Sequence, residues 1–162
     1  THFNLTETIN EVVKDMRKKT FAMHKDVDMD NMIPNIEFSE NHPLFIHADK
    51  DRIIQVVSNL LDNAIKFGED GAISIGLHRN NTENEVTVKI IDSGRGIDPE
   101  IYPRLFEKFV TKSNKGTGLG LFISKAVIGA HGGRIWAENN INRIGATFSF
   151  SLRLSDEDKE TN

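Results

Sequence analysis

The chain has 162 residues, enough for one domain with a single hydrophobic core. Hydrophobic residues make up 38% and charged residues 27%, a globular composition, and no run approaches the roughly 20 apolar residues that cross a bilayer. The net charge of −4 argues against a nucleic-acid binder, and the absence of cysteine excludes disulfides and thiolate sites.

The first predicted elements are two helices separated by short strands. Apolar residues recur at helical spacing over residues 5–24, with Thr6 as the expected N-cap. Residues 27–38 alternate loosely around Pro34 and predict short strands with a turn, and residues 44–48 predict another strand. Asp49 then caps a long helix that ends at Phe67.

The second half of the chain is predicted to be rich in strands. Residues 72–77 and 85–91 alternate and form a hairpin with its turn at 80–84. Loops follow at 92–99 and 110–117, with short helical turns at 99–109 between them. A third helix is expected at 118–131, and the last strands at 134–138 and 146–154.

This order of elements predicts an α+β fold. Strands follow one another without a helix between them, which excludes a doubly wound parallel sheet. Because each strand has one apolar face, we expect a two-layer sandwich with helices on one side of a mixed, mostly antiparallel sheet. The domain is expected to span residues 1–154, and the acidic residues 155–162 to form a disordered tail.

The long helix carries an unusual polar stripe. Gln55, Asn59, Asn63 and Lys66 align on one side. The opposite side carries Ile53, Val56, Val57, Leu60, Leu61, Ala64 and Phe67. Asparagine is a poor helix former, but its neutral oxygen can ligate Mg²⁺ and its amide can bind phosphate oxygens, while a lysine adds positive charge. An ordinary exposed helix face remains the alternative.

Three glycine-bearing loops accompany this stripe. Asp92-Ser-Gly-Arg-Gly-Ile97 follows a strand, so Asp92 could accept a hydrogen bond from an exocyclic amino group such as that of adenine; a tight turn is the alternative. Gly116-Thr-Gly-Leu-Gly-Leu121 opens the third helix, where free backbone N–H groups can bind phosphates. Gly145-Ala-Thr147 is equally compatible with a hairpin turn.

Together these segments resemble the conserved boxes of sensor histidine kinases. Asn59-Leu-Leu-Asp-Asn63-Ala-Ile-Lys66-Phe67 is similar to their N box, and the segment that begins at Asp92 to their G1 box. Phe106-Glu-Lys-Phe109 resembles the F box, and the segment that begins at Gly116 the G2 box. The resemblance covers nearly the whole chain and implies the Bergerat fold of the wider superfamily that includes gyrase.

The resemblance also implies ATP and Mg²⁺ as cofactors. Asn59 would ligate Mg²⁺, and Asn59 and Lys66 would be the catalytic residues. The full nucleotide site would comprise Asn59, Asn63, Lys66, Asp92, Gly94, Gly96, Ile97, Phe109, Lys112, Gly116, Thr117, Gly118, Leu119, Gly120, Leu121 and Thr147. The phosphate acceptor would be a histidine on a separate dimeric domain, with a response regulator downstream. We expect a cytoplasmic, monomeric domain without direct membrane contact.

Two other functions stay open at this point. ATP-hydrolysing relatives use a glutamate one turn before the first asparagine to activate water, whereas this chain has Gln55, which cannot act as a general base. None of the six histidines has the family's acceptor context, since His24 lacks a downstream proline and His42 directly precedes Pro43. We therefore favour a kinase over a gyrase-type ATPase or a non-enzymatic nucleotide sensor.

Overall fold

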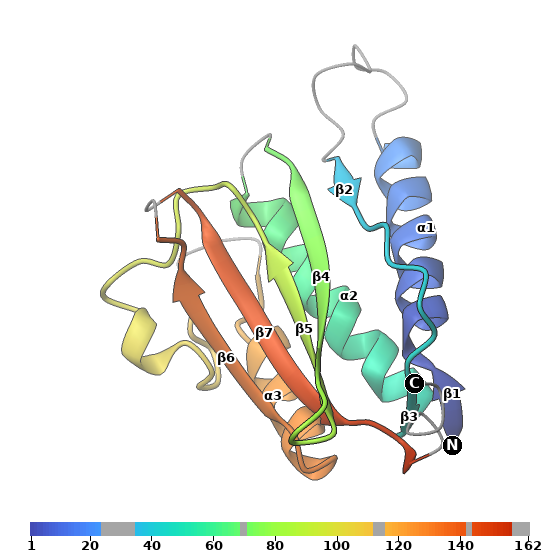
Figure 1. Cartoon of the computed structure of the whole chain (residues 1–162). Coiled ribbons are helices and arrows are strands. Elements are labelled where there is room, and N and C mark those ends of the chain that lie inside the picture. Colours follow the sequence, from blue (N-terminus) through green and yellow to red (C-terminus); the bar gives the residue numbers. More distant parts are fainter. Residues whose placement is uncertain (24–34, 69–70, 112–115, 142–143, 157–162) are drawn as a thin grey trace.

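The computed structural model describes residues 1–23, 35–68, 71–111, 116–141 and 144–156 (Figure 1). Its helices are α1 (Leu5–Met23), α2 (Lys50–Phe67), the short 3-10 helix η1 (Tyr102–Arg104) and α3 (Gly120–Ala130). Its strands are β1 (His2–Asn4), β2 (Ile36–Glu37), β3 (Phe45–His47), β4 (Ile73–Asn80), β5 (Glu85–Ile91), β6 (Arg134–Asn139) and β7 (Ala146–Arg153). None of the described helices has the length and apolarity to cross a membrane.

The main sheet has five strands in the order β2-β4-β5-β7-β6. Only β2 and β4 pair in parallel, and the other neighbours are antiparallel. In Figure 1, α2 and α3 lie behind this sheet and α1 lies beside α2. The predicted α+β fold, with a mixed and mostly antiparallel sheet and three helices, is confirmed.

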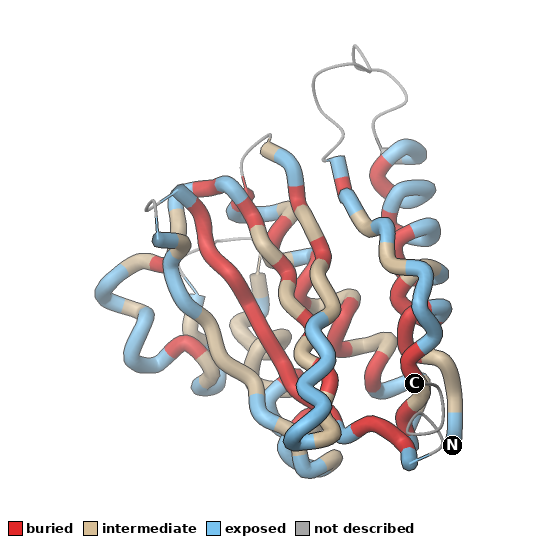
Figure 2. Tube along the Cα trace, in the orientation of Figure 1, coloured by how far each residue is buried: buried red, intermediate tan, exposed pale blue. Residues whose placement is uncertain are grey.

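The core lies between α2 and the inward face of the central strands. Figure 2 shows β7 buried along almost its whole length, and every residue of this strand except Arg153 is buried. Six apolar residues of α2 are also buried: Ile53, Val56, Val57, Leu60, Leu61 and Ala64. Phe67, predicted on the same apolar face, is instead 37% exposed and is the last residue of the helix. The core therefore ends one turn before α2 does.

The N-terminal region differs from its prediction. A second, two-stranded sheet pairs β1 with β3, and β1 was not predicted. The amide N–H of Glu7 donates to Asn4 Oδ1 at 3.4 Å, whereas the Thr6 hydroxyl donates to the His42 carbonyl at 2.7 Å. The N-cap role predicted for Thr6 is therefore wrong, since its hydroxyl is used in a tertiary contact.

The other boundaries agree with prediction to within a few residues. Asp49 caps α2 as expected, accepting from the Arg52 N–H at 3.2 Å. Helix α3 begins at Gly120, two residues later than expected. At the C-terminus, the N–H of buried Ser155 donates to the Phe45 carbonyl at 2.9 Å, so Ser155 packs against the region of β3. Residues 24–34 and 157–162 lie outside the described residues, as do the strand predicted from residue 27 and most of the predicted tail.

Candidate functional site

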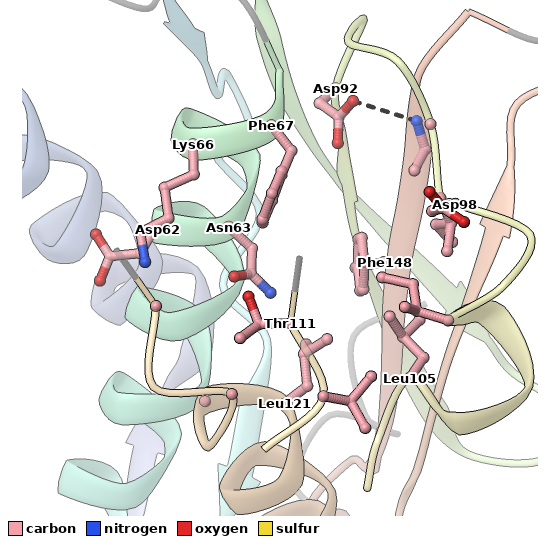
Figure 3. Close-up of a pocket in the computed structure, with 18 of the residues that line it drawn as sticks. Asp62, Asn63, Lys66, Phe67, Asp92, Asp98, Leu105, Thr111, Leu121 and Phe148 are labelled. Carbon is pink, nitrogen blue, oxygen red and sulfur yellow. Dashed lines mark hydrogen bonds between the residues drawn. The ribbon is translucent and has the colours of Figure 1, made fainter. Parts of the chain in front are cut away.

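A cavity of about 840 Å³ lies between α2, the loop after β5 and the N-terminus of α3 (Figure 3). The predicted site residues that line it are Asn59, Asn63, Lys66, Asp92, Gly96, Ile97, Gly116, Thr117, Gly118, Gly120 and Leu121. Further lining residues are Asp62, Phe67, Arg95, Asp98, Pro99, Ile101, Leu105, Val110, Thr111, Ala146 and Phe148. The α2 stripe and two of the glycine loops, distant in sequence, therefore meet around one cavity.

The polar side of α2 forms one wall of this cavity. Asn63, Lys66 and Phe67 project from α2 in Figure 3. The Asn59 amide nitrogen donates to the Gly120 carbonyl at 3.3 Å, which ties the middle of α2 to the start of α3. A Cβ atom added to Gly116 would lie 3.5 Å from Lys66 Nζ, so the ammonium group lies beside the backbone that precedes α3. The wall thus presents amides and a positive charge close to a helix N-terminus.

Asp92 is held rigidly at the end of β5. Its Oδ1 accepts the Gly94 N–H at 3.0 Å and the Ala146 N–H at 3.2 Å. The other oxygen is directed into the cavity (Figure 3). Burial raises the pKa of this carboxyl above its ordinary value, and the two backbone hydrogen bonds lower it in part. The geometry leaves one fixed hydrogen-bond acceptor for a ligand.

No side chain of the described residues caps the N-terminus of α3. Leu119 stands at the N-cap position without such a hydrogen bond, in contrast to Asp49 on α2. Uncapped N–H groups at a helix N-terminus attract anions. Gly118, just before this helix, has φ +69°, and a Cβ there would lie 2.6 Å from the backbone of Phe109. Glycine at this position lets the loop pass close to the 106–109 segment and aim the helix at the cavity.

Several predicted site residues do not line the cavity. Ala146 and Phe148 line it, and because neighbouring strand residues point to opposite faces, Thr147 lies on the other side, where its hydroxyl donates to Asn140 Oδ1 at 2.6 Å. Thr147 is therefore not among the residues that line the cavity, and its contact with the nucleotide through water stays a prediction. Gly94 and Leu119 are likewise absent from the lining, and Lys112 falls outside the described residues.

The apolar wall of the cavity was not predicted from the sequence. Ile101 and Leu105 come from the segment around η1, and Phe148 comes from β7. The sequence predicts that the apolar face of β7 packs in the core, and it does not predict that this face also lines the cavity. Asp62 was also missed: partial burial raises the pKa of its carboxyl, while the charges of Lys19 and Lys66 lower it. Asp62 directly precedes Asn63 in the sequence, and this position could have predicted it as a lining residue of the cavity.

Comparison with known proteins agrees with this geometry. The family model described as "Histidine kinase-, DNA gyrase B-, and HSP90-like ATPase" matches residues 48–156, which is more than half of the chain. The chain belongs to this ATPase family. Its matched region begins just before α2 and ends after β7, so it contains every element that lines the cavity.

Relatives within the family are sensor kinases. The chain is 38% identical over 94% of its length to the adaptive-response sensory kinase SasA of Gloeothece citriformis, of which the match covers 37%. It is 37% identical to the catalytic domain of the histidine kinase ThkA, with 94% of both chains covered and a TM-score of 0.76. Full-length ShkA, solved in complex with AMPPNP, is 25% identical with a TM-score of 0.74, covering 96% of this chain and 31% of ShkA. The chain spans no more than 37% of the first curated relatives that it matches.

The cavity has the size and chemistry for the ATP that this family binds. Its volume of about 840 Å³ falls within the roughly 300–1,000 Å³ typical of small-molecule sites. Asp92 offers an acceptor, Leu105 and Phe148 an apolar surface, and Lys66 a positive charge. Within the described residues no group of three or more His, Asp or Glu side chains could hold a metal. Asn59 and Asn63, which line the cavity, carry neutral amide oxygens of the type that can ligate Mg²⁺.

Phe109 belongs to the predicted nucleotide site but is not among the residues that line the cavity, and it lies at the surface in a strained backbone conformation. Its side chain is 71% exposed and its φ is +62°, a conformation that costs a non-glycine residue roughly 1–2 kcal/mol. We expect Phe109→Gly to raise the free energy of unfolding by about 1 kcal/mol, because glycine adopts this φ freely and keeps the 2.9 Å hydrogen bond from residue 109 N–H to the Gly118 carbonyl. Urea denaturation measures this change. Phe109→Ala, which keeps the strain, is the control and should give no gain; an equal gain in both variants would contradict the strain.

Proposed function

We propose that this chain is the catalytic domain of a protein-histidine kinase, which binds ATP·Mg²⁺ and transfers the γ-phosphate to a histidine on a separate dimeric phosphoacceptor domain. The observation that carries the proposal is the meeting, around one cavity, of the amides and lysine of α2, the fixed Asp92 carboxylate and the uncapped N-terminus of α3. A response regulator would then receive the phosphate from the acceptor histidine. The kinase names of the relatives support this reading.

We propose the following orientation for the nucleotide. The adenine amino group donates to the oxygen of Asp92 that faces the cavity, and the ring lies against Leu105 and Phe148. The phosphates lie toward the N-terminus of α3, where backbone N–H groups and Lys66 neutralise their charge. Bound Mg²⁺ would supply further neutralisation of the phosphate oxygens, and Asn59 would hold it through its side-chain oxygen.

Gln55 supports a kinase over an ATPase. It is not among the residues that line the cavity, and its Oε1 accepts from the Arg52 guanidinium at 3.1 Å. An amide cannot take a proton from water in the way that a carboxylate does. The imidazole of an acceptor histidine is already a competent nucleophile, so the domain needs mainly to position the γ-phosphate. We infer that the isolated domain is monomeric and turns over ATP slowly.

Radiolabelled ATP distinguishes the candidate functions. The chain would be incubated with γ-labelled ATP, alone and with a separately purified phosphoacceptor domain of the parent kinase. We expect the label on the acceptor domain and little free phosphate. Steady phosphate release by the chain alone would point to a gyrase-type ATPase, and ATP binding without either product would point to a nucleotide sensor.

Asn59→Ala tests the metal site. We expect the variant to bind ATP in the presence of Mg²⁺ about tenfold more weakly, or about 1.4 kcal/mol. Affinity in EDTA should change little, because the expected role of Asn59 is to hold the metal. Calorimetric titrations with and without Mg²⁺ measure both values. An equal loss in the two conditions would contradict the metal role of Asn59.

A further inference from the structure

The amide of Asn59 is held on one side by α3. Its Nδ2 lies 3.3 Å from the Gly120 carbonyl oxygen and 3.4 Å from Ser124 Oγ. A backbone carbonyl oxygen only accepts hydrogen bonds, so the amide atom that faces Gly120 must be the nitrogen. The oxygen of Asn59 is then the amide atom that remains for the cavity, which Asn59 lines.

Ser124 is a buried residue of α3 that contacts the amide of Asn59. It lies one helical turn after Gly120, so its side chain and the Gly120 carbonyl meet Asn59 from the same face of α3. Its exposed fraction is 0%, and most side-chain hydroxyls buried so deeply have a hydrogen-bond partner. For Ser124 that partner is the amide nitrogen of Asn59. Serine is an ordinary rather than a favourable residue inside a helix, so packing alone does not call for it at this position.

Two acceptors restrict the amide more than one does. With the Gly120 carbonyl alone, the Asn59 amide could tilt about its terminal torsion, which is soft for an asparagine. The hydroxyl of Ser124 lies beside that carbonyl and holds the nitrogen from a second direction. A flipped amide would place the oxygen of Asn59 against the Gly120 carbonyl oxygen, an arrangement that two acceptors disfavour.

We propose that Ser124 is a positioning residue for the metal ligand, which holds the Asn59 amide so that its oxygen faces the cavity before nucleotide and Mg²⁺ bind. The inference rests on the proposed function, because it takes Asn59 as the Mg²⁺ ligand. Residues that orient a metal ligand typically contribute about tenfold to a hundredfold in metal affinity. Because the Gly120 carbonyl remains in place when the hydroxyl is removed, the effect at Ser124 is expected to lie below that range and below the effect of removing Asn59 itself.

The first test is a titration of ATP into the Ser124→Ala protein in Mg²⁺ and in EDTA. We expect the affinity gained on adding Mg²⁺ to fall by about threefold, less than the loss expected for Asn59→Ala, with unchanged affinity in EDTA. Ser124→Cys, which keeps a weaker acceptor of similar size, should lie between the wild type and Ser124→Ala. Equal Mg²⁺ gains in all three proteins, or an equal loss in Mg²⁺ and EDTA, would overturn the positioning role.

Ser149→Ala is the matched control. Ser149 is the same residue type, is also 0% exposed, and has no hydrogen-bond partner for its hydroxyl among the described residues. It is not among the residues that line the cavity, so its removal should leave the Mg²⁺ gain unchanged. A loss at Ser149→Ala as large as at Ser124→Ala would assign the effect to burial of a serine rather than to the contact with Asn59, and would overturn the proposal.

The second test needs neither nucleotide nor metal. The side-chain amide of Asn59 gives a pair of ¹⁵N–¹H signals in the nucleotide-free protein, identified by their loss in Asn59→Ala. Ser124→Ala should shift this pair and speed its exchange with solvent, whereas Ser149→Ala should leave it unchanged. An unchanged pair in Ser124→Ala overturns the contact. If wild-type protein showed no Mg²⁺ gain at all, the proposed function would fail, while this spectrum would still decide whether Ser124 holds the amide.

Discussion

Asp92→Asn is expected to weaken ATP binding by about 2 kcal/mol or more, a roughly 30-fold loss of affinity. The substituted side chain can keep its oxygen toward the N–H groups of Gly94 and Ala146, which Asp92 Oδ1 accepts at 3.0 and 3.2 Å. Its amide nitrogen then replaces the oxygen that faces the cavity and opposes the adenine amino group, donor against donor. Calorimetric titration of ATP measures the loss, and unchanged affinity would mean that Asp92 does not contact the base.

The same variant should not destabilise the fold. Burial raises the pKa of Asp92, so the folded protein holds its proton more tightly than the unfolded chain does. The free energy of unfolding therefore increases as the pH falls from the raised pKa toward the ordinary one, and ionisation at neutral pH costs stability. Asp92→Asn removes this pH-dependent part. We expect an equal or higher Tm at neutral pH; a lower Tm would show that the carboxylate stabilises the loop.

Gly94→Ala is expected to reduce the free energy of unfolding by about 3 kcal/mol. A Cβ at this position would lie 1.9 Å from the Phe67 carbonyl oxygen and 2.7 Å from the Gly68 Cα, both backbone atoms that cannot rotate away. The loop after β5 would have to move off the end of α2. Because the Gly94 N–H holds Asp92 Oδ1, ATP affinity should fall together with stability.

Gly129→Ala serves as the control for this substitution. Gly129 lies in α3 with nothing within 4 Å of an added Cβ. Alanine in a helix is favoured over glycine, so this variant should gain about 0.5–1 kcal/mol. Urea denaturation of both variants measures the difference. A Gly94→Ala protein as stable as the Gly129→Ala protein would refute the close packing of the loop on α2.

Gly94 lies in a predicted binding motif, but the structure gives a packing reason for a glycine at this position. The resemblance to the G1 box implies that Gly94 belongs to the nucleotide site. In the structure, the backbone at Gly94 instead packs closely against the backbone of Phe67 and Gly68 at the end of α2. Glycine is required in both cases, so the residue type alone does not distinguish contact with a ligand from contact with a helix end.

Elements with a strong periodic pattern were predictable from the sequence. The apolar face of α2 and its cap Asp49 are local features of about one helix length, and so is the alternation along β4, β5 and β7. The polar stripe of α2 and the glycine loops could be connected with one another because four motifs occurred in the order of a known family. For this reason most lining residues from α2, the Asp92 loop and the start of α3 were anticipated.

The sequence by itself thus determined the class of fold, the helix that carries Asn59, Asn63 and Lys66, and the membership of the ATPase family, because these depend on periodicity and on short motifs. Only the tertiary structure decided that Thr147 faces away from the cavity, that Thr6 bonds to His42 and not to its own helix, and that Ser124 lies behind the Asn59 amide. The physical reason is that a polar side chain chooses among hydrogen-bond partners that are close in space and distant in sequence. That choice is settled only when the sheet and helices pack together.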